Sequence, residues 1–220
     1  MPGAGLIDAV LFDFGGVFTL SPFESVRAAA VALGVDGDMA VAFCFGPYDR
    51  DTEHAWHRME RGEITLEATR AELLELAAAE GHGLDPFELL RATGGEDTQR
   101  QPMVERALAL VAQGYRTAAV TNNVKEFGAG WRAMVPVDDL FEVIIDSSAV
   151  GVRKPDPRIY HLALDALGGI APERAVLLDD ALGNIAAAEA IGMHTVLVGA
   201  DRLAAMDELD DLLEGRRPAR

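Results

Sequence analysis

Four apolar runs in this chain contain no regular alternation with polar residues. Polar residues follow these runs at Asp13, at Thr121 and Asn122, at Asp146, and at Asp179 and Asp180. Unbroken runs of this kind are typical of strands that are buried on both faces of a parallel sheet. Ligands of open α/β sheets bind beyond the carboxyl ends of the strands. We therefore expect one crevice to receive the Asp13 carboxylate, the Thr121 hydroxyl, the Asp179–Asp180 pair, and the ammonium of Lys154 from the loop after Asp146.

The spacing of the runs predicts the architecture. A strand–helix–strand unit takes roughly 30 residues, and 25 residues separate Thr121 from Asp146 while 33 separate Asp146 from Asp179. The 108 residues between Asp13 and Thr121 are too many for one crossover helix. We predict an α/β fold, a Rossmann-like parallel sheet flanked by helices, with an inserted α-helical cap domain. Residues 1–17 and 97–220 would form the catalytic core and residues 18–96 the cap.

Helix signals occur throughout the predicted cap. Ser21 and Glu24 have the spacing of a capping box, and Pro22 occupies the first helical position. Thr65 stands where a second helix would be capped, and residues 49–61 are predicted as a third helix. A helical lid over the crevice would exclude water and contact the substrate.

Charge and cysteine content restrict the partners and the compartment. A net charge of -17 argues against binding to nucleic acid or to an anionic membrane surface. Cys44 is the single cysteine, which favours a reducing compartment. The N-terminus lacks the pattern of a secretory signal, and no apolar stretch approaches the length of a membrane span. We expect a cytoplasmic monomer or homodimer whose partner is a small-molecule substrate.

The balance of cations singles out one residue. The chain has seventeen arginines and only two lysines, Lys125 and Lys154, and Lys154 lies beside an arginine in GVRKPDPRIY. Lysine is a compact point charge, whereas arginine is a wide planar fork, so the two differ at a tight phosphate site. Composition alone supports a surface position for Lys154 equally well, but the surrounding loop favours a functional one.

The aspartates carry the expected chemistry. Singly, Asp13 has the position of a turn residue, and Asp179 and Asp180 have those of a helix cap and its neighbour. Together, three carboxylates at one sheet edge would resist ionisation unless cations lie among them. Lys154 and Mg²⁺, which prefers hard oxygen ligands, would supply that compensation. This set suits phosphoryl transfer through an aspartyl-phosphate with a divalent metal.

Two glycines follow Asp13 closely. Gly15 and Gly16 do not form a dinucleotide fingerprint, because GxGxxG is absent, and the chain has no GxxxxGK[ST] segment either. Their expected role is to let the backbone turn tightly and approach a ligand.

The segments DFGGV, TNN, GVRKPDPRIY and LLDDALGNIAAAEAIG resemble, in the right order, the four motifs of the haloacid dehalogenase-like hydrolase superfamily. The resemblance covers nearly the whole chain. Within the superfamily it is strongest to the bacterial α-glucose-1-phosphate phosphatases and to the N-terminal phosphatase domain of soluble epoxide hydrolase. It implies Asp13 as the nucleophile, Lys154 as the charge clamp, and Thr121, the Asn122 backbone and Gly16 as phosphate ligands. It implies a magnesium site made by Asp13, the Gly15 carbonyl, Asp179 and Asp180.

One position departs from the family pattern. Most phosphatases of this superfamily carry a second aspartate, which protonates the leaving group, where this chain has Gly15. Glycine keeps the carbonyl that binds magnesium and loses the acid, as it does in the bacterial glucose-1-phosphate phosphatases. The loss suggests a good leaving group, or a proton donor from the cap such as His54 or His57.

The predicted function is a magnesium-dependent phosphatase that hydrolyses a small phosphate monoester, such as a sugar phosphate, through an aspartyl-phosphate. A 2-haloacid dehalogenase would also use Asp13, but it needs no metal and leaves the Asp179–Asp180 pair without a purpose. A phosphonate hydrolase of this fold takes a lysine from the cap, and residues 18–96 contain none. A catalytically weak phosphate-binding regulatory protein is the third alternative, because Gly15 removes the acid.

Overall fold

Five parallel strands form one sheet in the computed structural model, which describes residues 7–79, 85–91 and 97–215. The strands are β1 (Ala9–Phe12), β2 (Arg116–Thr121), β3 (Val143–Asp146), β4 (Ala175–Asp179) and β5 (His194–Leu197). Their order in the sheet is β3-β2-β1-β4-β5, so β1 is central and lies between β2 and β4. The predicted α/β fold with a parallel sheet is confirmed.

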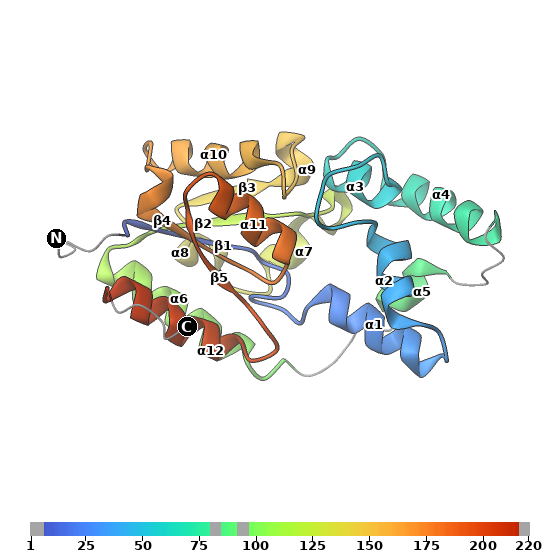
Figure 1. Cartoon of the computed structure of the whole chain (residues 1–220), viewed down its shortest axis with the longest axis horizontal. Coiled ribbons are helices and arrows are strands. Elements are labelled where there is room, and N and C mark those ends of the chain that lie inside the picture. Colours follow the sequence, from blue (N-terminus) through green and yellow to red (C-terminus); the bar gives the residue numbers. More distant parts are fainter. Residues whose placement is uncertain (1–6, 80–84, 92–96, 216–220) are drawn as a thin grey trace.

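Helices cover both faces of the sheet (Figure 1). On one face lie α6 (Arg100–Gln113) and α12 (Arg202–Leu213), and on the other lie α10 (Pro157–Ala166) and α11 (Leu182–Ala190). Side chains alternate along each strand, so Phe12 packs with the first pair of helices and Leu11 with the second. Burial on both faces is the reason that the strand sequences show no polar alternation.

Short helical segments connect these elements. They are α7 (Gly128–Arg132), α8 (Val137–Leu140), α9 (Ser147–Val150), and the two 3₁₀ segments η1 (Lys125–Phe127) and η2 (Pro172–Arg174). No helix among the described residues combines the length and the apolar character that a membrane crossing requires.

Among the residues that the structure describes between β1 and α6, five helices lie at one end of the sheet (Figure 1). They are α1 (Pro22–Ala32), α2 (Gly37–Phe45), α3 (Ala55–Glu60), α4 (Leu66–Ala79) and α5 (Pro86–Arg91). Their apolar side chains share a cluster of their own, in which Phe45, Met59 and Leu73 are buried. Val124, from the loop after β2, joins this cluster and connects the helices to the sheet.

Two local predictions in this insertion are wrong and one is confirmed. The helix expected at residues 49–61 begins only at Ala55, because the His54 ring caps it by accepting a bond from the Trp56 N–H. Ser21 makes no capping bond, and its side chain interacts instead with the Asp180 carboxyl. Thr65 caps α4 as expected, since its hydroxyl accepts from the Ala68 N–H at 3.1 Å. The predicted cap boundary at residue 96 lies outside the described residues.

Candidate active site

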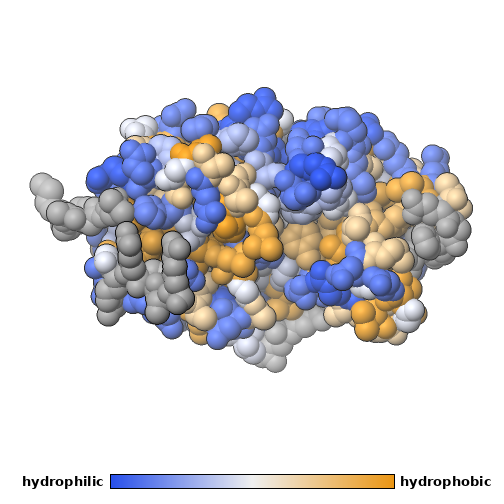
Figure 2. All heavy atoms as spheres, viewed as in Figure 1, coloured by the Kyte–Doolittle hydropathy of each residue, from blue (hydrophilic) through white to orange (hydrophobic). Residues whose placement is uncertain are grey.

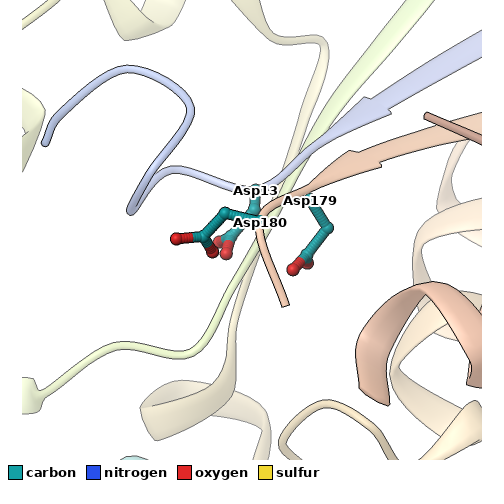
Figure 3. A group of neighbouring side chains, drawn as sticks. All are labelled: Asp13, Asp179 and Asp180. Carbon is teal, nitrogen blue, oxygen red and sulfur yellow. The ribbon is translucent and has the colours of Figure 1, made fainter. Parts of the chain in front are cut away.

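Three carboxylates meet where β1 and β4 end side by side (Figure 3). The strand register pairs Phe12 with Leu178, so Asp13 follows β1 next to Asp179 at the end of β4. Oxygen atoms of Asp13, Asp179 and Asp180 lie within 4.8 Å of one another. Among the described residues, this is the one group of three or more acidic, histidine or cysteine side chains with the proximity that a metal ion requires.

Lys154 joins two of these carboxylates. Its Nζ lies 2.8 Å from Oδ1 of Asp13 and 2.7 Å from Oδ2 of Asp179, and the side chain is completely buried. A surface position for Lys154 is therefore excluded. Asp179 is also held by the Ala181 N–H and the Asn184 amide, each at 2.9 Å from Oδ1. The oxygens of Asp179 are thus engaged within the protein.

Asp180 differs from Asp179 in this respect. Its Oδ2 is buried and has no hydrogen-bond partner in the structure. A buried polar atom without a partner costs free energy, so this oxygen is available as a ligand atom for a cation. The oxygens of Asp180 and Asp13, together with the nearby backbone, are the hard donors that Mg²⁺ prefers.

The electrostatics of the group follow from its burial. Desolvation raises the pKa of Asp13 to about 8, with Asp179 and Asp180 adding to the shift and Lys154 opposing it. Desolvation, followed by the charge of Asp179, raises the pKa of Asp180 to about 7. Burial alone would lower the pKa of Lys154, but the carboxylates of Asp13 and Asp179 outweigh it and raise that pKa above its ordinary value. The site carries more negative charge than one lysine neutralises.

Residues at the end of β2 face the same site. Thr121 is the last residue of β2, and Asn122 follows it. The Asn122 side chain pairs with the Lys154 backbone in both directions, donating to its carbonyl at 3.0 Å and accepting from its N–H at 2.7 Å. The sequence predicted a role for the Asn122 backbone only, whereas the side chain positions the loop that carries Lys154.

The two glycines have different environments. Gly16 has a φ of +73°, and a Cβ built on it would lie 2.1 Å from Oδ2 of Asp180, so only glycine fits there. Gly15 does not have a positive φ, and the nearest atom to its Cβ position is 3.8 Å away in Pro22. Gly16 thus lies close against the Asp180 side chain, and the approach of the pair to a ligand stays a prediction.

A cavity of about 450 Å³ opens over Asp13. The predicted site residues among its lining are Asp13, Gly15, Thr121, Asn122 and Asp180. The insertion contributes the opposite wall from α1, α2, α3 and the residues near them. The structure thus brings these sequence-predicted residues to a single cavity.

Neither His54 nor His57 is among the residues that line this cavity. The Nδ1 of buried His57 accepts from the Thr52 N–H at 3.0 Å, and burial, together with the charge of Arg153, lowers its pKa to about 3. His54 is occupied as the cap of α3. Neither histidine therefore has the position of a proton donor.

Sequence reasoning missed a buried cluster beside the site. Glu60 of α3 accepts from Tyr48 Oη at 2.5 Å, from Trp56 Nε1 at 2.8 Å, and from Arg153 Nε at 2.7 Å. The Arg153 guanidinium lies over the Tyr48 ring, 4.8 Å from its centre. The position of Arg153 directly before Lys154 was the one sequence feature that could have indicated this cluster. No sequence feature indicated Glu60, because Arg153 is 93 residues away from it in the chain.

A family model described as haloacid dehalogenase-like hydrolase matches residues 7–192. Among curated proteins, the chain is 33% identical to mouse acyl-CoA dehydrogenase family member 10, over 93% of this chain and 19% of that protein. It is 28% identical to mouse bifunctional epoxide hydrolase 2, over 85% of this chain and 35% of that protein. The chain therefore spans only a minor part of these two relatives.

Two further matches cover most of the length of both aligned proteins. Protein CbbY of Cereibacter sphaeroides is 31% identical, over 90% of this chain and 91% of that protein. A HAD family enzyme of Bacteroides thetaiotaomicron, solved in complex with magnesium and inorganic phosphate, superposes with a TM-score of 0.57 at 18% identity. The superposition covers 89% of this chain and 96% of that chain and shows a shared fold.

Proposed function

The chain belongs to the haloacid dehalogenase-like hydrolases, and on this premise we propose that it is a magnesium-dependent phosphatase acting on a phosphate monoester. The observation that carries the proposal is the arrangement at the carboxyl edge of the sheet. Asp13 stands there against the buried Lys154 ammonium and beside Asp180, which has an unpartnered buried oxygen. Hydrolases of this family need a nucleophile, and a carboxylate is able to attack phosphorus and form a covalent intermediate.

Asp13 is the proposed nucleophile. Its carboxylate oxygen attacks phosphorus while the ester P–O bond breaks and the organic group leaves as an alcohol or phenol. Water then hydrolyses the aspartyl-phosphate, which releases inorganic phosphate and restores the Asp13 carboxylate. Lys154 would favour the ionised form of Asp13 and attract the phosphate, and Thr121, the Asn122 backbone and Gly16 would bind phosphate oxygens.

Magnesium is the proposed cofactor. Asp13, the Gly15 carbonyl and Asp180 would hold it, with Asp179 nearby and already engaged by Lys154. When bound, Mg²⁺ supplies positive charge that offsets the repulsion between phosphate and carboxylates. The bound magnesium and phosphate named for the Bacteroides enzyme of the same fold support this assignment.

The leaving group receives no proton from residue 15, because Gly15 has no side chain. Neither His54 nor His57 lines the cavity, so the histidines do not replace the acid. We infer that the enzyme acts best on esters of phenols and other good leaving groups, which depart without an acid. Residues 18–96 are proposed as a cap that closes the cavity and excludes water.

The test is phosphate release from p-nitrophenyl phosphate, with magnesium and with a chelator. We expect turnover that requires magnesium and that Asp13→Asn abolishes, because the amide keeps the shape but does not attack phosphorus. Asp165→Asn, at an exposed aspartate of α10, is the control and should retain turnover. Activity of Asp13→Asn within about tenfold of wild type would contradict the nucleophile, and full activity in chelator would contradict the magnesium requirement.

A further inference from the structure

We propose that the organic group of the substrate is large and apolar, and is not a sugar; this rests on the proposed phosphatase function and names its substrate class. The cavity over Asp13 is the basis. Aromatic side chains make much of its wall: Phe14, Phe23, Phe45, Trp56, Phe127 and Trp131. A wall of this kind binds apolar groups through removal of their surface from water, and it offers few partners for hydroxyl groups.

Most polar side chains of the cavity wall are already engaged within the protein, although Oδ1 of Asn184, near Asp179 at the Asp13 end, has no hydrogen-bond partner. Glu60 accepts from Tyr48, Trp56 and Arg153. Recognition of a sugar requires donors and acceptors that offset the desolvation of its hydroxyl groups. Glu60 is the one carboxylate of the wall outside the Asp13–Asp180 group, and its oxygens are not available for that purpose.

Asn123 is engaged in the same way, and Arg100 is engaged in part. The Asn123 amide donates to Asp146 at 2.9 Å, and its backbone N–H donates to the Ser147 hydroxyl. The Arg100 guanidinium donates to the Phe18 carbonyl at 3.1 Å. Apart from the remaining N–H groups of Arg100, the polar groups left for a ligand lie at the Asp13 end of the cavity, and the aromatic part of the wall fits an apolar group.

Exposed apolar side chains surround the opening of the cavity. Leu20, Phe127 and Met134 line it and are 44%, 49% and 42% exposed, so an apolar group bound there would remove part of their surface from water. Leu20 and Phe23 also line a wider groove of about 1190 Å³, whose walls include the exposed Leu182 and Leu197. Figure 2 shows apolar side chains gathered on this face over α11 and at the end of α1. A long apolar group would continue from the cavity into this groove.

The experiment uses phenyl phosphates with a hydrogen, ethyl, butyl or hexyl group in the para position, assayed with magnesium. These esters have nearly the same leaving group, so the series varies only the apolar surface. We expect kcat/KM to rise by up to about fourfold per added methylene until the cavity is filled, mainly through KM. A para-glucosyloxy group, which is of similar bulk but polar, should bring no gain over phenyl phosphate.

Phe127→Ser tests the cavity opening, with the kcat/KM ratio of the hexyl ester to phenyl phosphate as the readout. This ratio should fall at least about fivefold, since the lost ring would cover several methylenes. Leu162→Ser is the control: Leu162 is 40% exposed on α10 and lines neither the cavity nor the groove, so the ratio should stay unchanged.

The outcomes separate the two proposals. If no ester is hydrolysed, phenyl phosphate included, the phosphatase function itself is overturned. If phenyl phosphate is hydrolysed but the series is flat, or the glucosyloxy ester is preferred, the phosphatase function stands and the apolar substrate is overturned. If kcat/KM does not change along the series and the protein is a dimer that Phe127→Ser dissociates, the exposed apolar side chains instead bind a second copy of the chain.

Discussion

Arg153 and Glu60 form a buried ion pair that ties the helical insertion to the loop carrying Lys154. The Arg153 Nε lies 2.7 Å from Oε2 of Glu60, and both side chains are almost completely buried. Glu60 belongs to α3, and Arg153 directly precedes Lys154. Buried ion pairs need further hydrogen bonds, which Tyr48 and Trp56 provide to Glu60. The position of the lysine at Asp13 therefore depends on contacts made by the insertion.

Glu60→Gln should destabilise the protein by about 3 kcal/mol, because it leaves the Arg153 charge buried with only Asp51 nearby at 3.4 Å. It should also lower kcat/KM, since the loop that carries Lys154 loses its anchor. Urea unfolding and turnover of p-nitrophenyl phosphate measure the two effects. The matched control is Glu72→Gln, a half-exposed partner of Arg58, which should cost less than about 1 kcal/mol. Equal losses in the two variants would show that the buried pair has no special role.

Lys154→Arg should remove most of the activity although the charge is kept. The ammonium lies between Asp13 and Asp179 at 2.8 and 2.7 Å in a completely buried site, and a guanidinium is too wide for that position. Lys125→Arg is the natural control, since Lys125 is the other lysine of the chain and is exposed. Steady-state kcat should fall at least about a hundredfold in the first variant, as for loss of a preorganised charge, and remain normal in the second. Normal kinetics for Lys154→Arg would contradict the charge-clamp role.

Gly15→Asp should fold normally and should accelerate alkyl phosphates relative to aryl phosphates. The backbone at Gly15 lacks the positive φ that disfavours other residues, and its Cβ position is open. General acid catalysis contributes about 10²–10⁴-fold, and poor leaving groups benefit most from it. Gly15→Asn has the same size without the acid and should bring no gain. A wild-type enzyme that cleaves alkyl and aryl esters equally fast would show that a proton donor is already present.

The metal-free protein should lose stability as the pH rises from about 4 to 8. Burial raises the pKa of Asp180 to about 7 and that of Asp13 to about 8, both from 3.8, so in this range the folded state binds more protons than the unfolded state. Magnesium binds the deprotonated carboxylates, so the increase in Tm that it causes should be larger at pH 8.5 than at pH 5.5. Asp180→Asn should remove most of that increase, whereas Asp165→Asn, on the exposed side of α10, should not. A magnesium effect that is independent of pH would contradict the assignment.

Site residues could be predicted where their sequence position alone indicates their place in the fold. The sequence marks the carboxyl end of a strand at Asp13 and at the Asp179–Asp180 pair, and Lys154 lies in a loop with its own sequence signal. Parallel strands place their carboxyl ends at one edge of the sheet, so these residues could be expected to meet. The capping box at Ser21 was a wrong prediction, because local spacing says nothing of Asp180, which the Ser21 side chain contacts instead. The helix at residues 49–61 was too long for a similar reason, since His54 caps α3 with its ring.

By itself, the sequence determined the parallel sheet, the helical insertion and the carboxylate–lysine set. A strand that is buried on both faces has apolar side chains at nearly every position, and this pattern can be recognised in the sequence alone. Only the tertiary structure decided the strand order, the Arg153–Glu60 pair and the apolar wall of the cavity. Glu60 and Arg153 are 93 residues apart, and the aromatic wall combines side chains from Phe14 to Trp131. Contacts between segments so distant depend on how the insertion packs against the sheet, which no local pattern encodes.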